Sequence, residues 1–187
     1  MLHSSVPLAE RMRPTTFDDF VGQEHLVSPQ AVLRKMIESR NLSSFILWGP
    51  PGVGKTTLAR IIAQDLERTF YSLSAVSSGV KDVREVIERS RSNKMFQKNR
   101  PILFIDEIHR LGKAVEEVLY PAMEDFALDI VIGKGPSARS IRLKLPKFTI
   151  IGATTRLALL SAPLRARFGA IFRVDYYDEE SLRQIIQ

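Results

Sequence analysis

The chain has 187 residues, of which 44% are hydrophobic and 26% are charged, and its formal net charge is +6. That length can bury the core of one globular domain, and the absence of cysteine excludes disulfides and thiolate metal sites. No apolar run approaches the ~18 residues of a membrane span, and the N-terminus lacks the apolar core of a signal peptide, so we expect a cytoplasmic protein without membrane contact. The basic balance permits nucleic-acid binding and equally fits a solvated basic surface.

The elements, taken in chain order, alternate between helices and apolar strands. After a polar arm at 1–16, the spacing predicts a helix at 29–42, a strand at 45–48, a helix at 56–66, a strand at 69–76, a helix at 80–93, a strand at 101–106, a helix at 114–126, a strand at 148–154, a short helix at 162–168, a strand at 170–177 and a helix from 178 on. Pro121 predicts a kink or break, and Asp178 or Ser181 a helix cap. Strands of nearly continuous apolar residues between helices predict an α/β fold with a five-stranded parallel sheet covered on both faces.

One segment departs from this alternation. Residues 128–145 alternate apolar and polar side chains on both sides of the turn sequence GKGP. This pattern predicts a β-hairpin inserted before the strand at 148–154.

The sequence GPPGVGKT lies between the first predicted strand and the next helix. Glycines there let successive backbone N–H groups point at phosphate oxygens, and the following helix adds its positive dipole end. Lys55 would place a cation on the β- and γ-phosphates, and the Thr56 hydroxyl would bind Mg²⁺. The predicted phosphate-binding residues are Gly49, Pro50, Pro51, Gly52, Val53, Gly54, Lys55, Thr56 and Thr57.

Two carboxylates end the strand at 101–106. Ligands of open α/β sheets bind at the carboxyl ends of the strands, where Asp106 would hold Mg²⁺ and Glu107 would polarise the water that attacks the γ-phosphate. A strand and a helix separate this motif from the glycine-rich loop, which suggests that another strand lies between the two in the sheet.

Two later segments carry further candidates. The strand at 148–154 runs into Thr154, Thr155 and Arg156, where a polar side chain would position the lytic water unless the segment is a plain turn. Arg165 and Arg167 follow in PLRARFG and either pair with local acids or reach the γ-phosphate bound by a neighbouring subunit.

With these residues the chain resembles the AAA+ ATPases, P-loop NTPases whose large subdomain is such an α/β sandwich. Segments before about residue 100, such as LAERMRPTTFDDFVGQEHLV, resemble the RarA/MgsA family of replication-fork ATPases. From about Pro101 on, LFIDEIHRLGKAVEEVLYPAMED and IIGATTRLALLSAPLRARFG resemble RuvB, the Holliday-junction branch-migration motor. The resemblance implies a nucleotide-binding subdomain at 17–187, ATP and Mg²⁺ as ligands, and a homo-oligomeric ring such as a hexamer.

The resemblance also implies site roles. Thr155 would be the sensor residue of the strand at 148–154, and Arg167, with Arg165 second, would be the arginine supplied in trans. Arg13, Phe20, Val21 and Gly22 would lie along the adenine pocket. The hairpin 128–145 would dock on a RuvA-like protein, while its cations between Lys134 and Lys147 leave DNA contact or a solvated hairpin as alternatives.

Three functional hypotheses follow. We favour an ATP-hydrolysing motor in DNA recombination and repair, RuvB-like in branch migration of four-way junctions. A RarA/MgsA-like ATPase at stalled replication forks is the alternative, and a nucleotide-binding interaction module or an inactive fragment is the third. The resemblance places a helical lid and a C-terminal DNA-binding domain beyond Gln187, so we expect turnover and ring assembly to depend on them.

Overall fold

A computed structural model describes residues 12–92, 100–132 and 138–186, so most of the predicted arm at 1–16 lies outside the described residues. The elements are α2 (Glu24–Val27), α3 (Val32–Glu38), β1 (Phe45–Trp48), α4 (Lys55–Asp65), β2 (Phe70–Ser74), α5 (Val80–Ser92), β3 (Ile102–Asp106), η2 (Ile108–Arg110), α6 (Lys113–Glu124), β4 (Ala127–Ile132), β5 (Arg139–Lys144), β6 (Thr149–Thr154), η4 (Leu157–Leu159), α7 (Ala162–Arg165), β7 (Ala170–Arg173) and α8 (Glu179–Ile186). No helix in the described part is long and apolar enough to cross a bilayer.

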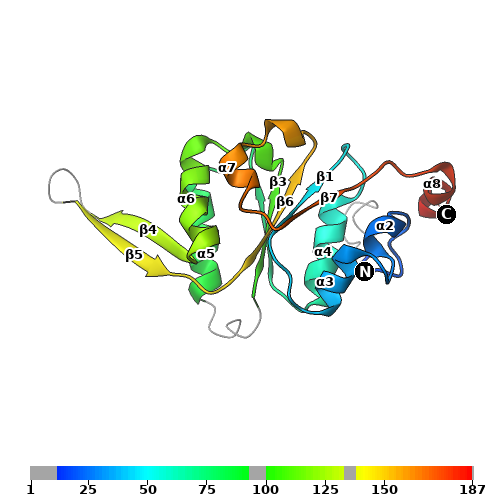
Figure 1. The fold of residues 1–187 in the computed structure, drawn as a ribbon, viewed down its shortest axis with the longest axis horizontal. Coiled ribbons are helices and arrows are strands. Elements are labelled where there is room, and N and C mark those ends of the chain that lie inside the picture. Colours follow the sequence, from blue (N-terminus) through cyan, green and yellow to red (C-terminus); the bar gives the residue numbers. More distant parts are fainter. Residues whose placement is uncertain (1–11, 93–99, 133–137, 187) are drawn as a thin grey trace, which may run out of the picture.

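Five strands form one parallel sheet in the order β2-β3-β6-β1-β7 (Figure 1). β6 is the middle strand and is buried along its whole length, which its apolar sequence TIIGAT allows. The predicted five-stranded parallel sheet is therefore confirmed. So is the expectation that another strand, here β6, lies between the loop strand β1 and the carboxylate strand β3.

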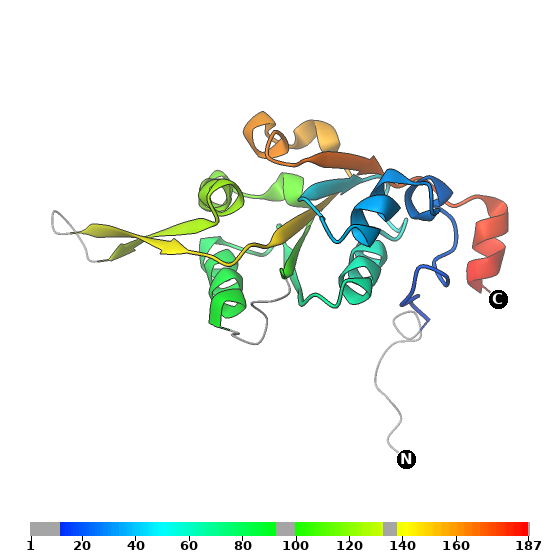
Figure 2. The ribbon, with the colours of Figure 1, turned by 60° about the horizontal axis from the view of Figure 1, so that its bottom comes forward.

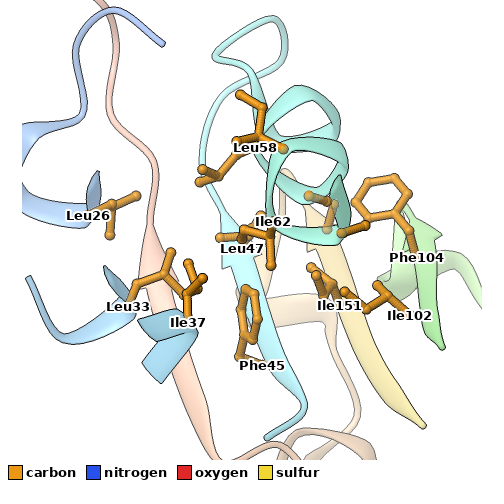
Figure 3. Packing of buried hydrophobic residues seen from close by; sticks show 14 of the residues in the cluster. Leu26, Leu33, Ile37, Phe45, Leu47, Leu58, Ile62, Ile102, Phe104 and Ile151 are labelled. Carbon is orange, nitrogen blue, oxygen red and sulfur yellow. The ribbon is translucent and has the colours of Figure 1, made fainter. Parts of the chain in front are cut away.

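Helices cover both faces of the sheet, because successive strand residues point to opposite sides. In β1, Phe45 and Leu47 join the cluster formed with α3 and α4, whereas Ile46 joins the cluster formed with α5, α6 and α7. Figure 3 shows the first cluster, in which Leu58 and Ile62 of α4 lie against the β1 side chains. Two buried apolar layers thus hold the sheet edges, and with them the strand ends, in fixed positions.

The hairpin of β4 and β5 extends away from the sandwich, on the side opposite α8 (Figure 2). Its antiparallel register pairs Leu128 with Leu143 and Ile130 with Ile141, so one face is apolar. At its base Leu128 and Leu145 are buried, and the Leu145 N–H donates to the Phe126 carbonyl at 2.7 Å. The predicted hairpin at 128–145 is confirmed, although its tip at 133–137, with Lys134, lies outside the described residues.

Some predicted boundaries were wrong. Pro121 does not break its helix: α6 continues to Glu124, because Leu119 and Ala122 on either side of the proline are fully buried in the core. The strands predicted to end at 76 and 177 end at Ser74 and Arg173, and the helix predicted at 162–168 ends at Arg165.

Of the two predicted caps for the last helix, Asp178 is the one the structure uses. Its Oδ1 accepts from the Ser181 N–H at 2.8 Å. Hydrogen bonds from Ser181 hold the pKa of Asp178 below its ordinary value.

Gly49 provides a test of how the sheet closes around the glycine-rich loop. The Val174 N–H donates to the Trp48 carbonyl at 2.8 Å, and a Cβ on Gly49 would lie 2.0 Å from the Val174 carbonyl oxygen. We expect Gly49→Ala to lower the free energy of unfolding by about 2–3 kcal/mol, because backbone must move to admit the methyl group. Urea unfolding followed by circular dichroism measures it.

The matched control is Gly112→Ala, since a Cβ there meets nothing within 4 Å and the φ of Gly112 is −66°. We expect that variant to unfold within about 1 kcal/mol of the parent, since Gly112 is the N-cap of α6, where alanine is less favourable than glycine. Equal urea midpoints for both variants would contradict the close approach at Gly49.

Candidate functional site

The segment 49–56 joins β1 to the first turn of α4, where the sequence predicts a phosphate-binding loop. Gly52 and Gly54 have left-handed backbone, with φ of 77° and 91°, and Gly54 is the N-cap of α4. Val53 is buried in the core and anchors the loop, while Thr56 and Thr57 are half-buried at the start of the helix. A loop of this form followed by free helical N–H groups favours an anion.

Lys55 is folded back into this loop. Its Nζ donates to the carbonyl oxygens of Gly49 at 2.8 Å and Pro50 at 2.6 Å, and only 7% of the residue is exposed. Burial lowers the pKa of Lys55 below its ordinary value, while the charges of Glu107 and Asp106 oppose that shift. The ammonium group is thus held in the loop, within electrostatic reach of both carboxylates.

The two carboxylates lie where β3 ends. Asp106 is the last residue of the strand, and its Oδ1 accepts from the Glu107 N–H at 3.1 Å. Glu107 has left-handed backbone, with φ 49° and ψ 45°, before the single turn η2. A residue other than glycine in this conformation carries strain, which is frequent at functional sites. The turn points Glu107 toward β6 and away from the continuation of β3.

Thr155 and His109 hold the Glu107 side chain. The Thr155 hydroxyl donates to Glu107 Oε2 at 3.0 Å, and His109 Nδ1 lies 3.2 Å from the same oxygen. His109 Nδ1 also lies 2.8 Å from the hydroxyl of Thr154, which is fully buried. The structure therefore joins Thr155 to Glu107, and it adds His109, which no sequence motif singles out.

A second missed residue, Tyr177, connects the loop to the segment at 20–22. A Cβ on Gly54 would lie 2.7 Å from the Tyr177 hydroxyl and 3.3 Å from the Phe20 ring, and one on Gly22 would lie 3.1 Å from the Tyr177 ring. Burial raises the pKa of Tyr177. Phe20 and Gly22 thus lie beside the loop, with the half-buried Val21 between them. No sequence signal identifies Tyr177, because it follows β7 and is distant in the chain.

The same segment is fixed by Gln23. Its side-chain amide donates to the Asp175 carbonyl at 2.7 Å and accepts from the Asp175 N–H at 2.9 Å. Arg13, in contrast, is not brought to the loop: it lines a hollow with Arg60 and Gln64, near the opposite end of α4. The structure therefore separates Arg13 from the other predicted adenine-pocket residues.

The two candidate arginines differ in their surroundings. Arg167 Nη2 lies 2.9 Å from Glu124, Nη1 donates to the Pro163 carbonyl at 2.7 Å, and the guanidinium lies 4.1 Å from the Tyr120 ring centroid. Arg165 is exposed and lines an open hollow beside Trp48. Arg167 precedes β7 at the amino edge of the sheet, whereas the loop lies at the carboxyl edge, so Arg167 does not contact the loop of its own chain.

The oxygen donors of the protein suit a Mg²⁺ ion whose other ligands come from a bound nucleotide and water. Thr56 offers a hydroxyl and Asp106 a carboxylate, both oxygen donors that suit Mg²⁺. Within the described residues no group of three or more His, Asp or Glu side chains is placed to hold a metal. That is the arrangement expected when phosphate oxygens and water complete the coordination of Mg²⁺.

The comparisons with known proteins agree with this geometry. Residues 12–174 match the family described as the Holliday junction DNA helicase RuvB P-loop domain. The chain is 46% identical over 186 residues to the Holliday junction branch migration complex subunit RuvB of Fusobacterium nucleatum, covering 98% of this chain and 54% of that protein. It is 52% identical over 181 residues to the RuvB subunit of Dehalococcoides mccartyi, covering 94% of this chain and 49% of that protein.

Solved structures give the same result. The Thermotoga maritima RuvB Holliday junction branch migration motor has a TM-score of 0.72 at 39% identity, over 94% of this chain and 52% of that one. A mutant of that protein has a TM-score of 0.76 at 40% identity, over 94% and 53%.

The chain spans about half the length of the curated relatives it matches. The similarity to RuvB runs through the first hundred residues as well, so the division expected near Pro101 is not needed to account for it, and the RuvB-like interpretation is supported over the RarA-like one. The chain belongs to the RuvB P-loop domain family of AAA+ ATPases.

Proposed function

We propose that this chain binds and hydrolyses ATP as the motor domain of a RuvB subunit that drives branch migration of four-way DNA junctions in the cytoplasm. The observation that carries the proposal is the contact between Glu107 and Thr155, which places a carboxylate from β3 against the end of β6, next to the loop that holds Lys55. The names of the relatives supply the DNA process.

Each residue of the site has a role in this mechanism. Lys55 would exchange the loop carbonyls for oxygens of the β- and γ-phosphates, while Thr56 and Asp106 would hold Mg²⁺. Mg²⁺, when bound, neutralises charge on those phosphates. Phe20 and Tyr177, which both lie beside Gly54, would line the pocket for the adenine ring.

Glu107 is the base that polarises the attacking water. Thr155 and His109 both contact Oε2, so Oε1 is the oxygen oriented toward the water. A carboxylate with one oxygen fixed loses little freedom in the transition state, and this pre-positioning favours the reaction. Thr155 and His109 therefore act as positioning residues for Glu107.

We infer that the subunits form a hexameric ring in which Arg167 acts in trans. Its position at the amino edge of its own sheet directs it away from its own ATP site. To reach a neighbour's γ-phosphate, Arg167 would release Glu124, 2.9 Å away in this structure. Arg165, which is already exposed, is the second candidate.

The hairpin fits a protein partner better than DNA. Ile141 is 45% exposed, so a large apolar side chain is available on the apolar face that it shares with Ile130. Arg142, one of its cations, is paired with Asp125 and lies 3.9 Å from Asp129, which reduces the charge available to phosphates. We infer that this hairpin docks on a RuvA-like protein.

Glu107→Gln tests the proposed base. We expect ATP turnover in the presence of four-way junction DNA to fall at least ~100-fold, because the amide cannot accept a proton, while nucleotide affinity stays within about threefold. Phosphate release and calorimetric titration measure the two quantities. Glu117→Gln, an exposed carboxylate of α6, is the matched control and should retain parental turnover. Turnover by Glu107→Gln at the parental rate would refute the assignment.

Thr155→Val tests the positioning of Glu107. Loss of a hydrogen bond to a charged group corresponds to ~1.5–3 kcal/mol, so we expect turnover to fall about 10-fold to 100-fold with little change in KM. Thr155→Ser retains the hydroxyl and should restore most of the rate. If valine and serine give the same rate, the hydroxyl has no part in positioning Glu107.

Ile141→Asp tests the hairpin. We expect this change to weaken binding to a purified RuvA protein by at least ~10-fold, because a carboxylate would be desolvated at the apolar contact. Ser140→Asp adds the same charge one residue away on the opposite face of β5 and should bind as the parent does. Surface plasmon resonance compares the two; equal losses would indicate a general charge effect, and no loss would exclude this face.

A further inference from the structure

One face of α6 holds Arg167, the arginine that the proposed function directs to a neighbouring subunit. Glu116, Tyr120 and Glu124 follow one another at intervals of four residues, so they lie on the same face of this helix. All three contact the segment that contains α7 and Arg167, and Figure 1 shows α7 beside α6. We call Glu116, Tyr120 and Glu124 the α6 stripe.

The Tyr120 ring supports the guanidinium of Arg167. Arg167 Cζ lies 4.1 Å from the centroid of that ring. An aromatic ring attracts a cation through its face, and this contact uses none of the N–H donors of the guanidinium. The ring therefore fixes the position of the charged group and leaves its terminal nitrogens able to bind an anion.

The contact between Arg167 and Glu124 is the one that an incoming phosphate would replace. Arg167 Nη2 lies 2.9 Å from Glu124 Oε1, and the Glu124 side chain is 54% exposed. Ion pairs in contact with water contribute little stability, so exchange of this carboxylate for a phosphate oxygen costs little. Arg167 Nε, in contrast, is buried without a hydrogen-bond partner among the described residues. Packing, in which Tyr120 takes part, holds that portion of the side chain.

Glu116 fixes the Tyr120 ring relative to α7. The Tyr120 hydroxyl donates to Glu116 Oε2 at 2.7 Å, and the Ser161 hydroxyl donates to the same oxygen at 2.8 Å. Ser161 is also the N-cap of α7, since its hydroxyl accepts from the Leu164 N–H at 3.3 Å. Burial and then the hydrogen bond to Glu116 raise the pKa of Tyr120, so the hydroxyl stays protonated as the donor. One carboxylate oxygen thus joins the ring under Arg167 to the helix that precedes this arginine.

We propose that Tyr120 is a positioning residue for Arg167: it keeps the guanidinium in place while that group exchanges Glu124 for the γ-phosphate bound by a neighbouring subunit. This inference rests on the proposed function and deepens it, because it names the side chain that sets the geometry of the arginine. Catalytic contacts are sensitive to displacements of about 1 Å, so an arginine held on a fixed ring loses less freedom when it reaches the phosphate. Loss of the ring should slow turnover at the neighbour's site and leave the chain's own site intact.

The test mixes two variants that are defective in different parts of the shared site. Arg167→Ala keeps the nucleotide site and lacks the arginine, whereas Glu107→Gln lacks the base and supplies the arginine. Each variant alone should turn over ATP slowly with four-way junction DNA, and an equimolar mixture should recover turnover where one chain of each kind meets the other. Tyr120→Leu is then introduced into one member of the mixture at a time.

We expect Tyr120→Leu in the Glu107→Gln chain, which supplies the arginine, to lower the recovered turnover about 5-fold to 30-fold. The same change in the Arg167→Ala chain should alter it less than twofold, because no arginine acts from that chain. The KM for ATP should stay within about twofold in both mixtures. Tyr120→Phe in the arginine-supplying chain keeps the ring and should retain turnover within about twofold.

The matched control is Tyr71→Leu in the arginine-supplying chain. Tyr71 and Tyr120 are both half-buried and pack against the same apolar cluster, so loss of either ring should lower the thermal unfolding temperature to a similar extent. Tyr71→Leu should nevertheless leave the recovered turnover within about twofold. Sedimentation velocity verifies that the mixtures assemble equally.

Three results would overturn the proposal. Equal losses with Tyr120→Leu in either chain would show that the ring only stabilises the fold. No loss in either chain would show that Arg167 does not depend on the ring. No recovery in the mixture without Tyr120→Leu would exclude action of Arg167 in trans, and the assignment of Glu107 would still stand if Glu107→Gln alone loses turnover.

Discussion

The position of β6 between β1 and β3 is the constraint on which the site depends. It places the phosphate-binding loop on one side of the central strand and Glu107 on the other, while Thr155 leaves β6 between them. If β1 and β3 were direct neighbours, Thr155 would not lie beside the carboxylate. This strand order is stabilised because β6 is buried along its whole length. The strand at the centre of the core therefore also positions Thr155 beside Glu107.

The two edges of the same sheet have opposite electrostatic character. At the carboxyl edge the cation Lys55 is compensated by Asp106 and Glu107, and burial lowers its pKa. At the amino edge, burial and then the like charges of Arg100 and Arg40 lower the pKa of Arg68. A parallel sheet produces this division naturally, because loops entering the strands and loops leaving them meet on opposite sides. The catalytic groups and these arginines are therefore spatially separate although they alternate along the chain.

The sequence was sufficient to predict the structural features that are formed by residues close to one another in the chain. The strand, loop and helix around Lys55 were predictable because glycine spacing and apolar runs specify them directly, and Asp106 and Glu107 because they end an apolar strand. Tyr177 and the His109 contacts were not, because they join segments far apart in sequence. Arg13 was expected beside the adenine pocket because it is near Phe20 in the sequence. The chain between them runs along α4, so Arg13 lies near the end of α4 that is remote from the loop. The helix break predicted at Pro121 is absent because burial of Leu119 and Ala122 outweighs the tendency of proline to end a helix.

We propose that the loop around Lys55 receives the phosphates of ATP. The most direct measurement is calorimetric titration of Mg²⁺ and ATP into the chain and into Lys55→Met, which keeps the length of the side chain and removes its charge. We expect at least ~10-fold weaker binding for the variant, since a charge-assisted hydrogen bond corresponds to ~1.5–3 kcal/mol. Equal affinities would show that the ammonium group stays on the Gly49 and Pro50 carbonyls, and would contradict the assignment of this loop.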